Sequence, residues 1–164
     1  MIDMRDFRSP QWYVDAAYGV HPDFRSHLAG ILKSTNDGGI IISGSNKQKL
    51  NTHSSTEAEL VACDNFLHRI LHTQRFLGEQ GLKVGTPVLH QDNKSTILLH
   101  EKGRGSLGKR TRHIEMRYFC IHDNVNRGNL KIFYCPAEDM VADYMSKPLQ
   151  GSLFLKFRKS VLGM

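Results

Sequence analysis

The sequence predicts an α/β fold with a mixed five-stranded sheet, three antiparallel strands followed by two parallel ones, flanked by helices. Three observations predict it. Three short β-prone segments open the chain, a long amphipathic segment follows them, and strand and helix patterns then alternate. A length of 164 residues fits one domain with its own hydrophobic core, so we expect a single domain over residues 1–164.

The first three strands are expected at residues 12–15, 27–32 and 40–42, where apolar and β-branched side chains gather. Between the second and the third lies the run Asn-Asp-Gly-Gly at residues 36–39, which is typical of a tight turn. Strands that follow one another this closely form an antiparallel meander.

A long helix is expected from Ser54 to about Leu77. The run from Ser54 to Glu57 has the pattern of a capping box, in which the serine hydroxyl accepts a hydrogen bond from the third helical N–H and the glutamate reaches back. Apolar side chains then recur at helical spacing as far as Leu77, and Gly78 follows. We expect one face of this helix to lie on the sheet.

Strand and helix patterns alternate in the rest of the chain, which favours parallel strands connected through helices. We expect strands at 87–91 and 130–134, helices at 93–100, 111–126 and 137–146, and a last amphipathic turn or helix in the tail, 151–164.

Composition favours a soluble, intracellular protein without membrane contact. The three cysteines are far apart and odd in number, which is typical of a reducing compartment. No run approaches the roughly 18 apolar residues of a membrane span, and the N-terminus has no apolar leader. The net charge of +6 suits a polyanionic partner such as nucleic acid.

Basic residues are concentrated in one short stretch that is interleaved with glycines. A flexible basic loop of this kind can follow a phosphate backbone closely, although a solvated surface loop has the same composition. The stretch contains Lys102, Arg104, Lys109, Arg110, Arg112 and Arg117.

Four acids stand at positions where acids are unusual. Asp15 lies within the first strand, Asp92 ends the fourth, Glu59 lies in the first turns of the long helix and Asp143 follows the fifth strand. Carboxylates that converge at one edge of a sheet repel one another and therefore normally bind hard cations such as Mg²⁺. Two such ions about 3.5–4 Å apart can promote phosphodiester cleavage. A lone Asp at a strand end is more often a turn or cap residue, and the spacing alone is no metal motif.

At these residues the sequence resembles the ribonuclease H domains of copia-type LTR retrotransposon polyproteins. The similarity extends over a core of about residues 12–150, and it is specific because the blocks occur together in the family's order. The blocks are residues 13–18 (YVDAAY), 45–51 (SNKQKLN) with 54–60 (SSTEAEL), 91–97 (QDNKSTI), 112–119 (RHIEMRYF) and 140–149 (MVADYMSKPL).

The resemblance implies a ribonuclease H-like fold and hydrolysis of the RNA strand of RNA–DNA hybrids with two Mg²⁺ ions, for which Mn²⁺ can substitute. It implies that Asp15 bridges both ions, that Glu59 and Asp92 hold one side and that Asp143 holds the other, giving 5′-phosphate products. It also implies a reverse transcriptase domain in the same polyprotein, working in the element's cytoplasmic virus-like particle.

Two assignments within the resemblance need a choice. Glu57 fits the capping role with Ser54, whereas Glu59 directly precedes the buried stripe at Leu60, so we expect Glu59 to be the ligand. Many relatives carry a histidine in the loop before the last aspartate, but residues 134–139 contain none. His113 is the candidate auxiliary residue in its place; a helix-surface or half-buried structural histidine is the equally weighted alternative.

Contacts to the hybrid are expected from polar residues near the acidic edge and from the basic stretch, which would bind phosphates of the DNA strand. Recognition of RNA would use its 2′-hydroxyl in the wide minor groove. Helix capping is the alternative role for the polar residues, and we favour it for Ser54. The candidates are Asn51, Ser54, Gln91, Asn93, Lys102, Arg104, Lys109, Arg110 and Arg112.

Three other functions remain open. One is a catalytically weak or inactive ribonuclease H-like module that binds nucleic acid and supports a reverse transcriptase, which the four intact acids disfavour. Another is a DDE integrase or transposase, but there the acids follow the order Asp, Asp, Glu rather than Asp, Glu, Asp, Asp. The last is a basic nucleic-acid-binding domain without activity, which metal-dependent cleavage would exclude.

Overall fold

The computed structural model describes residues 9–33, 35, 38–102 and 120–164. Its centre is one five-stranded sheet with the order β3-β2-β1-β4-β5. The strands β1, β2 and β3 form an antiparallel meander, whereas β4 runs parallel to β1 and β5 runs parallel to β4. The predicted mixed sheet is confirmed. The bounds are β1 Gln11–Ala17, β2 His27–Lys33, β3 Ile40–Lys47, β4 Val88–Gln91 and β5 Lys131–Tyr134.

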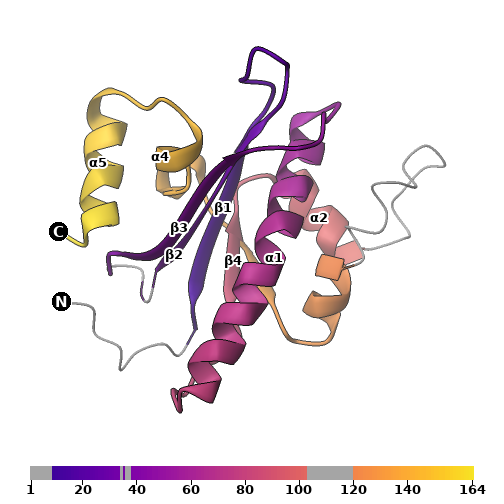
Figure 1. Ribbon diagram of the computed structural model, residues 1–164, viewed down its shortest axis with the longest axis vertical. Coiled ribbons are helices and arrows are strands. Elements are labelled where there is room, and N and C mark those ends of the chain that lie inside the picture. The colour runs from indigo at the N-terminus through magenta and orange to yellow at the C-terminus, as the bar shows by residue number, and fades with distance from the viewer. Residues whose placement is uncertain (1–8, 34, 36–37, 103–119) are drawn as a thin grey trace.

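Helices cover both faces of the sheet (Figure 1). On one face lie α1 (Ser55–Glu79), α2 (Lys94–Lys102) and a helical segment at 120–126; on the other lie α4 (Asp143–Ser146) and α5 (Gly151–Leu162). The predicted tail helix is confirmed as α5. None of the described helices combines the length and the hydropathy that a bilayer span requires.

The central strand β1 contributes to two separate cores because its side chains alternate between the faces. Trp12 and Val14 pack in the cluster beneath α1, together with Phe66 and Ile70 of that helix. Tyr13 points the other way, into a cluster with residues of α4 and α5. With apolar layers on both sides, β1 is fixed in place, and the acid that it carries at position 15 is fixed with it.

The capping box predicted at the start of α1 is confirmed. The Ser54 hydroxyl accepts a hydrogen bond from the backbone N–H of Glu57 at 3.1 Å. In return, the Glu57 carboxylate accepts one from the backbone N–H of His53 at 2.7 Å. The first bond satisfies a donor that the helix start leaves open, and the second ties the helix to the residue before its cap.

The single helix expected over residues 137–146 is wrong. The structure has a 3-10 turn, Ala137–Asp139, and then α4, which begins only at Asp143. Between them Met140, Val141 and Ala142 are all buried, with at most 3% exposure. Three consecutive residues cannot all face the core from one side of a surface helix, so the chain turns inward here and restarts as α4.

Other differences concern the ends of elements. The strand β3 continues to Lys47, well past the apolar residues that predicted it, because it pairs with β2 along its whole length. Of the helix expected at 111–126, only residues 120–126 belong to the described part of the chain, and they are helical. The turn residues Asn36 and Asp37 also lie outside the described residues.

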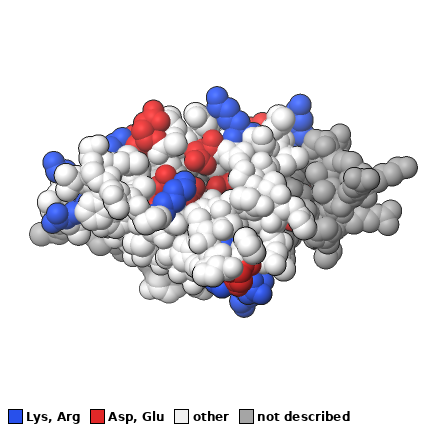
Figure 2. Space-filling model, turned by 90° about the horizontal axis from the view of Figure 1, so that it is seen from above, with Lys and Arg blue, Asp and Glu red and all other residues white. Residues whose placement is uncertain are grey.

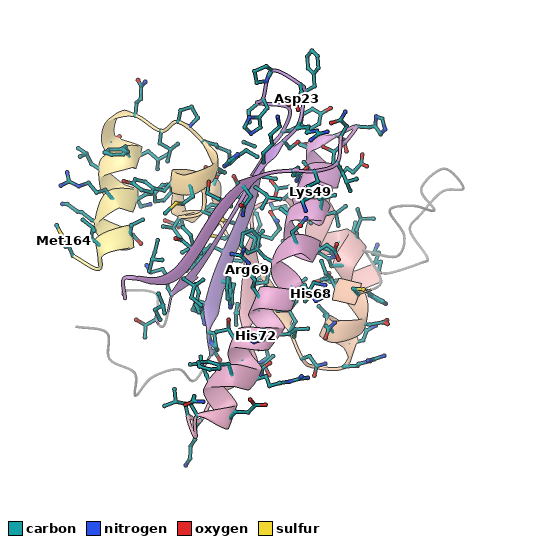
Figure 3. All side chains as sticks on the ribbon, viewed as in Figure 1. Asp23, Lys49, His68, Arg69, His72 and Met164 are labelled. Atoms are coloured by element: carbon teal, nitrogen blue, oxygen red, sulfur yellow. The ribbon has the colours of Figure 1, made fainter. Side chains whose placement is uncertain are left out.

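Two glycines of the meander make room for the ring of Phe66, which α1 places on the sheet. Gly30 in β2 and Gly44 in β3 face each other across the ladder, and a Cβ on Gly30 would lie 2.4 Å from the ring. The ring has little freedom to move away, since its centroid lies 6.5 Å from that of Trp12 and 5.5 Å from the guanidinium of Arg69. Arg69 is labelled on α1 in Figure 3.

Replacing Gly30 with alanine should therefore destabilise the protein by about 1–3 kcal/mol, the cost of overpacking a rigid core. Urea denaturation of Gly30→Ala measures this change. Gly78→Ala is the matched control, because it lies in α1 with no atom within 4 Å of an added Cβ. The control should be neutral or more stable by up to about 1 kcal/mol. Equal stability of the two variants would contradict the close approach of α1 to the sheet.

Candidate metal centre

Three of the four candidate acids meet at one end of the sheet, where the neighbouring strands β1 and β4 end. The strands β1 and β4 are parallel with Tyr13 opposite His90, so Asp15 and Asp92, two residues further along, reach the same level. Glu59 joins them from the second turn of α1. One carboxylate oxygen from each of the three lies within 4.8 Å of the others. Viewed from above, Figure 2 shows acidic side chains gathered in the middle of this end, with a basic side chain against them.

The backbone and a neighbouring amide hold Glu59 in position. Its Oε1 accepts a hydrogen bond from the backbone N–H of Ala16 at 3.2 Å, and its Oε2 accepts one from the side-chain amide of Gln91 at 3.2 Å. Glu59 is only 5% exposed, whereas Glu57 lies half-buried in its capping bond. The geometry therefore favours Glu59 over Glu57 as the acid that faces a cation.

The fourth acid, Asp143, is connected to the group through a lysine. Lys147 Nζ lies 2.7 Å from Asp143 Oδ1 and 3.3 Å from Asp15 Oδ1. The hydroxyl of Ser146 donates to the other oxygen of Asp15, Oδ2. We call Asp15, Glu59, Asp92 and Asp143 the acidic centre. Sequence reasoning did not single out Ser146 or Lys147, although the i,i+4 spacing of Asp143 and Lys147 is a usable signal for the pair.

Burial and mutual repulsion disturb the ionisation of this centre. The pKa of Asp143 is raised to about 7 by burial and by the charge of Asp15. Burial and the charges of Asp15 and Asp92 raise the pKa of Glu59 well above its usual value. Burial and Asp15 also raise the pKa of Asp92. A cluster with such disturbed carboxyls, on neighbouring structural elements, is typical of a functional site.

Lys147 is held in its charged form at the same place. Burial alone would lower its pKa, but the carboxylates of Asp15 and Asp143 outweigh burial and raise the pKa above the usual range. The ammonium is thus a permanent positive charge at one side of the acidic centre.

The donor set fits a hard divalent cation. Oxygen ligands lie about 2.0–2.6 Å from Mg²⁺ or Ca²⁺, so oxygens around one ion are at most roughly 4–5 Å apart. The oxygens of Asp15, Glu59 and Asp92 meet that limit. All three are carboxylates, and two of them are at least 95% buried, so their repulsion is poorly screened by water. A cation between them would relieve it.

The polar candidates for nucleic-acid contact occupy different positions. Gln91 is fully buried; it donates to Glu59 and accepts from the backbone N–H of Asn93, so it positions Glu59 rather than facing a ligand. Asn93 caps α2 by accepting from the N–H groups of Ser95 and Thr96. Ser54 caps α1.

Two of the other candidates are exposed in the described chain. Asn51 lies just before α1, and Lys102 is the last residue of α2. The remaining basic candidates and the auxiliary histidine lie outside the described residues; they are Arg104, Lys109, Arg110, Arg112 and His113.

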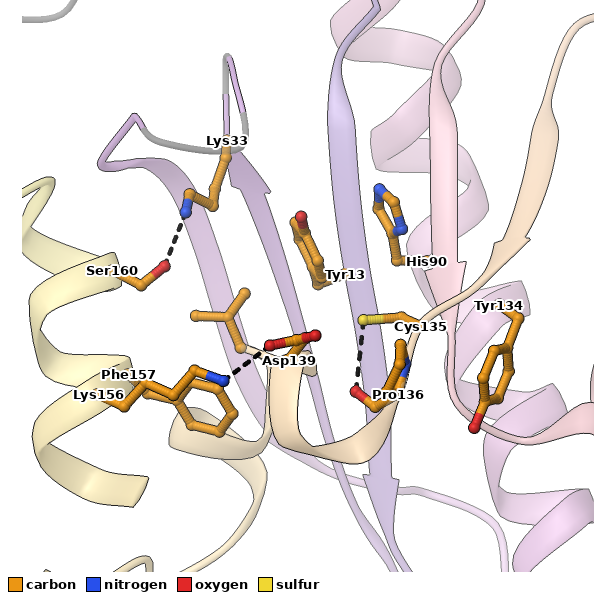
Figure 4. A pocket seen from close by; sticks show the side chains of 11 residues that line it. Tyr13, Lys33, His90, Tyr134, Cys135, Pro136, Asp139, Lys156, Phe157 and Ser160 are labelled. Atoms are coloured by element: carbon orange, nitrogen blue, oxygen red, sulfur yellow. Dashed lines mark hydrogen bonds and ion pairs between the residues drawn. The ribbon is translucent and has the colours of Figure 1, made fainter. Parts of the chain in front are cut away.

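A pocket of about 490 Å³ lies between β1 and α5, on the face of the sheet opposite α1 (Figure 4). Its lining includes Tyr13, which stacks on His90 at 4.4 Å, and Lys33, whose ammonium donates to the hydroxyl of Ser160 at 2.7 Å. No member of the acidic centre lines it. The acids and this pocket are therefore separate features.

Replacing Glu59 with glutamine should abolish tight binding of Mn²⁺, measured by isothermal titration calorimetry. The matched control is Glu57→Gln, which should bind the ion normally and lose about 1 kcal/mol or less through its weakened cap. Normal binding by Glu59→Gln together with lost binding by Glu57→Gln would reverse the assignment.

Without metal, the melting temperature of the parent should fall relative to that of Asp143→Asn as the pH rises from about 5 to 8. The pKa of Asp143 is about 7 in the folded protein and lower in the unfolded chain, so its contribution to stability is complete at low pH and lost as the pH rises through 7. Each kcal/mol lost lowers the melting temperature by about 2–4 °C at this size.

Calorimetry of the parent and of Asp143→Asn at each pH isolates this contribution as the difference between their melting temperatures. Adding Mg²⁺ at pH 8 should restore most of the lost stability in the parent. The comparison cancels the protons that His90 and His100 gain on unfolding, because both proteins contain these buried histidines, whose pKa values are lowered to about 4 and about 3. A difference that stays constant, or that changes in favour of the parent as the pH rises, would contradict the carboxylate repulsion.

No protein-family model matches the chain. Over 152 residues, 93% of its length, it is 32% identical to the retrovirus-related Pol polyprotein from transposon TNT 1-94 of Nicotiana tabacum, and covers 11% of that protein. Over 135 residues, 82% of its length, it is 29% identical to the transposon Ty1-NL2 Gag-Pol polyprotein of Saccharomyces cerevisiae, and covers 8% of it. The chain thus spans about a tenth of the length of these relatives.

Solved structures match the fold. LC11-RNase H1, isolated from compost by a metagenomic approach and solved in complex with an RNA/DNA hybrid, superposes with a TM-score of 0.57 at 17% identity, over 84% of this chain and 93% of that one. The protease-reverse transcriptase of prototype foamy virus superposes with a TM-score of 0.59 at 9% identity, over 98% of this chain and 21% of that one. The motifs, the sequence relatives and the fold together identify the chain as a relative of copia-type retrotransposon Pol polyproteins that has the ribonuclease H fold.

Proposed function

We propose that the chain hydrolyses the RNA strand of RNA–DNA hybrids with two divalent cations, Mg²⁺ or Mn²⁺, during reverse transcription of a retrotransposon. One observation carries the proposal. Asp15, Glu59 and Asp92 come from three separate elements, yet their carboxylate oxygens lie within 4.8 Å of one another. Such a cluster of buried acids costs stability unless it holds cations, so the chain retains it at the expense of its own free energy of folding.

Each acid has a distinct part in this proposal. A carboxylate oxygen of Asp15 lies within 4.8 Å of oxygens of Glu59 and Asp92, and Asp15 also contacts Lys147, the partner of Asp143, so it lies between the two sides of the centre. Glu59 and Asp92 hold one cation with it, and Asp143 holds the other. Bound cations activate water and stabilise the leaving 3′ oxygen. Gln91 keeps the carboxylate of Glu59 oriented and is a positioning residue.

The substrate proposal rests on exposed polar and basic residues and on the net charge. Asn51, in the loop before α1, is exposed, and so is Lys102, from which the basic stretch starts at the end of α2. A net charge of +6 supports binding to a phosphate backbone. We propose that the basic stretch binds the DNA strand and that polar groups near the acids contact the 2′-hydroxyls of the RNA. The compost enzyme with the same fold was solved with an RNA/DNA hybrid.

We further propose that residues 1–164 act as one domain of a polyprotein that also contains a reverse transcriptase. Its sequence relatives are Pol and Gag-Pol polyproteins, and a protease-reverse transcriptase contains the same fold. In that setting the natural place of action is the cytoplasmic particle in which the element copies its RNA, and His113 is the candidate auxiliary residue there.

The proposal is tested by incubating a hybrid, labelled on either strand, with Mg²⁺ or Mn²⁺. We expect metal-dependent cutting of the RNA strand alone, with 5′-phosphate ends, and no cutting of double-stranded RNA or DNA. Asp92→Asn should lower the rate by at least about 100-fold, since even residues behind the ligands of a metal commonly cost 10–100-fold. Asp123→Asn, at an exposed acid that is paired with Arg127 and is not part of the acidic centre, is the matched control and should keep full activity.

Absence of cleavage with either metal, by a protein that still binds the hybrid, would contradict the nuclease and leave a binding module that supports a reverse transcriptase. Cleavage that survives in Asp92→Asn would contradict the assignment of the centre. Cleavage of double-stranded RNA at the same rate would contradict the choice of the hybrid as substrate.

A further inference from the structure

Lys147 places a positive charge at the side of the acidic centre that is formed by Asp15 and Asp143. Its ammonium lies between Asp15 and Asp143, at 3.3 and 2.7 Å from one oxygen of each. The three oxygens that fit around one ion belong to Asp15, Glu59 and Asp92. The centre thus has two sides: an all-carboxylate side, and a side on which a lysine already neutralises the acids.

This contact differs from an ordinary surface ion pair. The side chains of its acids are 1% and 8% exposed, so the pair is screened little by water. The lysine side chain itself is 36% exposed and reaches the acids from the solvent side. A flexible four-carbon stem carries its charge, so the ammonium can leave the site without any change in the helix that precedes it.

We propose that the ammonium of Lys147 occupies the second cation position, so that the first divalent ion binds beside Asp15, Glu59 and Asp92 and a second ion binds beside Asp143 only by displacing Lys147. The inference rests on the cation-binding part of the proposed function and not on hydrolysis. Both places have Asp15 in common, whose two carboxylate oxygens are engaged by Lys147 and Ser146.

Two consequences distinguish this role from simple stabilisation of α4. The two ions should bind with clearly different affinities, since only the second competes with a tethered charge. In addition, the lysine should matter most when metal is absent, because it is then a cation in contact with both Asp15 and Asp143.

The test is to titrate the whole chain with Mn²⁺ and to measure binding both by calorimetry and by the electron paramagnetic resonance signal of the free ion. Lys147→Met keeps the length of the stem and removes the charge, and Lys147→Arg keeps the charge. We expect the parent to bind one ion tightly and a second more weakly. In Lys147→Met the second ion should bind at least about 10-fold more tightly, as removal of a charge at this distance implies, and the metal-free melting temperature should fall.

Lys147→Arg should resemble the parent in both readouts. Lys156→Met is the matched control: it breaks another lysine–aspartate pair of 2.7 Å, with Asp139, in which both side chains are more than half exposed. It should leave both affinities unchanged. Because both ion affinity and melting temperature are measured for Lys147→Met, a loss of stability can be told apart from a change in the affinity for the second ion.

Equal affinities for the second ion in the parent and in Lys147→Met would overturn the inference while leaving the proposed metal centre intact. Binding of no ion by either protein would contradict the proposed function as well. A second ion that binds more weakly in Lys147→Met than in the parent would show that the lysine supports that ion instead of competing with it, and would also overturn the inference.

Discussion

Repulsion between buried carboxylates governs how this end of the molecule is built. Asp15, Glu59 and Asp143 are each at most 5% exposed, yet they lie close to one another at one end of the sheet. Among the described residues, four groups donate to these acids: the amide of Gln91, the N–H of Ala16, the hydroxyl of Ser146 and the ammonium of Lys147. The donors reduce the cost of the charges without removing it, and the remainder favours cations.

Two apolar layers supply the rigidity that this arrangement needs. The layer beneath α1 fixes that helix on the meander through Phe66 and Ile70, and with it the position of Glu59. The layer on the other face fixes α4 through Met140 and Val141, and with it Asp143 and Lys147. Because β1 takes part in both, small displacements of either layer would reach Asp15. A site that needs oxygens within a few ångströms of one another depends on such support.

The sequence predicted the mixed five-stranded sheet and the capping of α1, and it singled out the acids of the proposed centre, because alternation, helical spacing and the motif blocks are local patterns. It did not predict what depends on contacts between distant segments. Gln91 reads as a polar strand end, and only the packing of β4 against α1 shows its amide facing Glu59. Lys147 reads as a helix-end lysine, and its contact with Asp15 spans 132 positions. The break before α4 arises because Met140, Val141 and Ala142 are buried together.

The spread of the four acids along the chain sets when the centre can come into being. Asp15 meets Ser146 across 131 positions, so the loop that joins them is nearly the whole domain. Contacts between residues so far apart in the sequence form late in folding, because the entropy cost of closing the long loop must be met first. On a ribosome that emits the chain from its N-terminus, the first three acids emerge well before Asp143 and Lys147. A nascent or truncated chain that lacks residues 143–147 therefore holds an incomplete centre, and the emergence of this segment completes it.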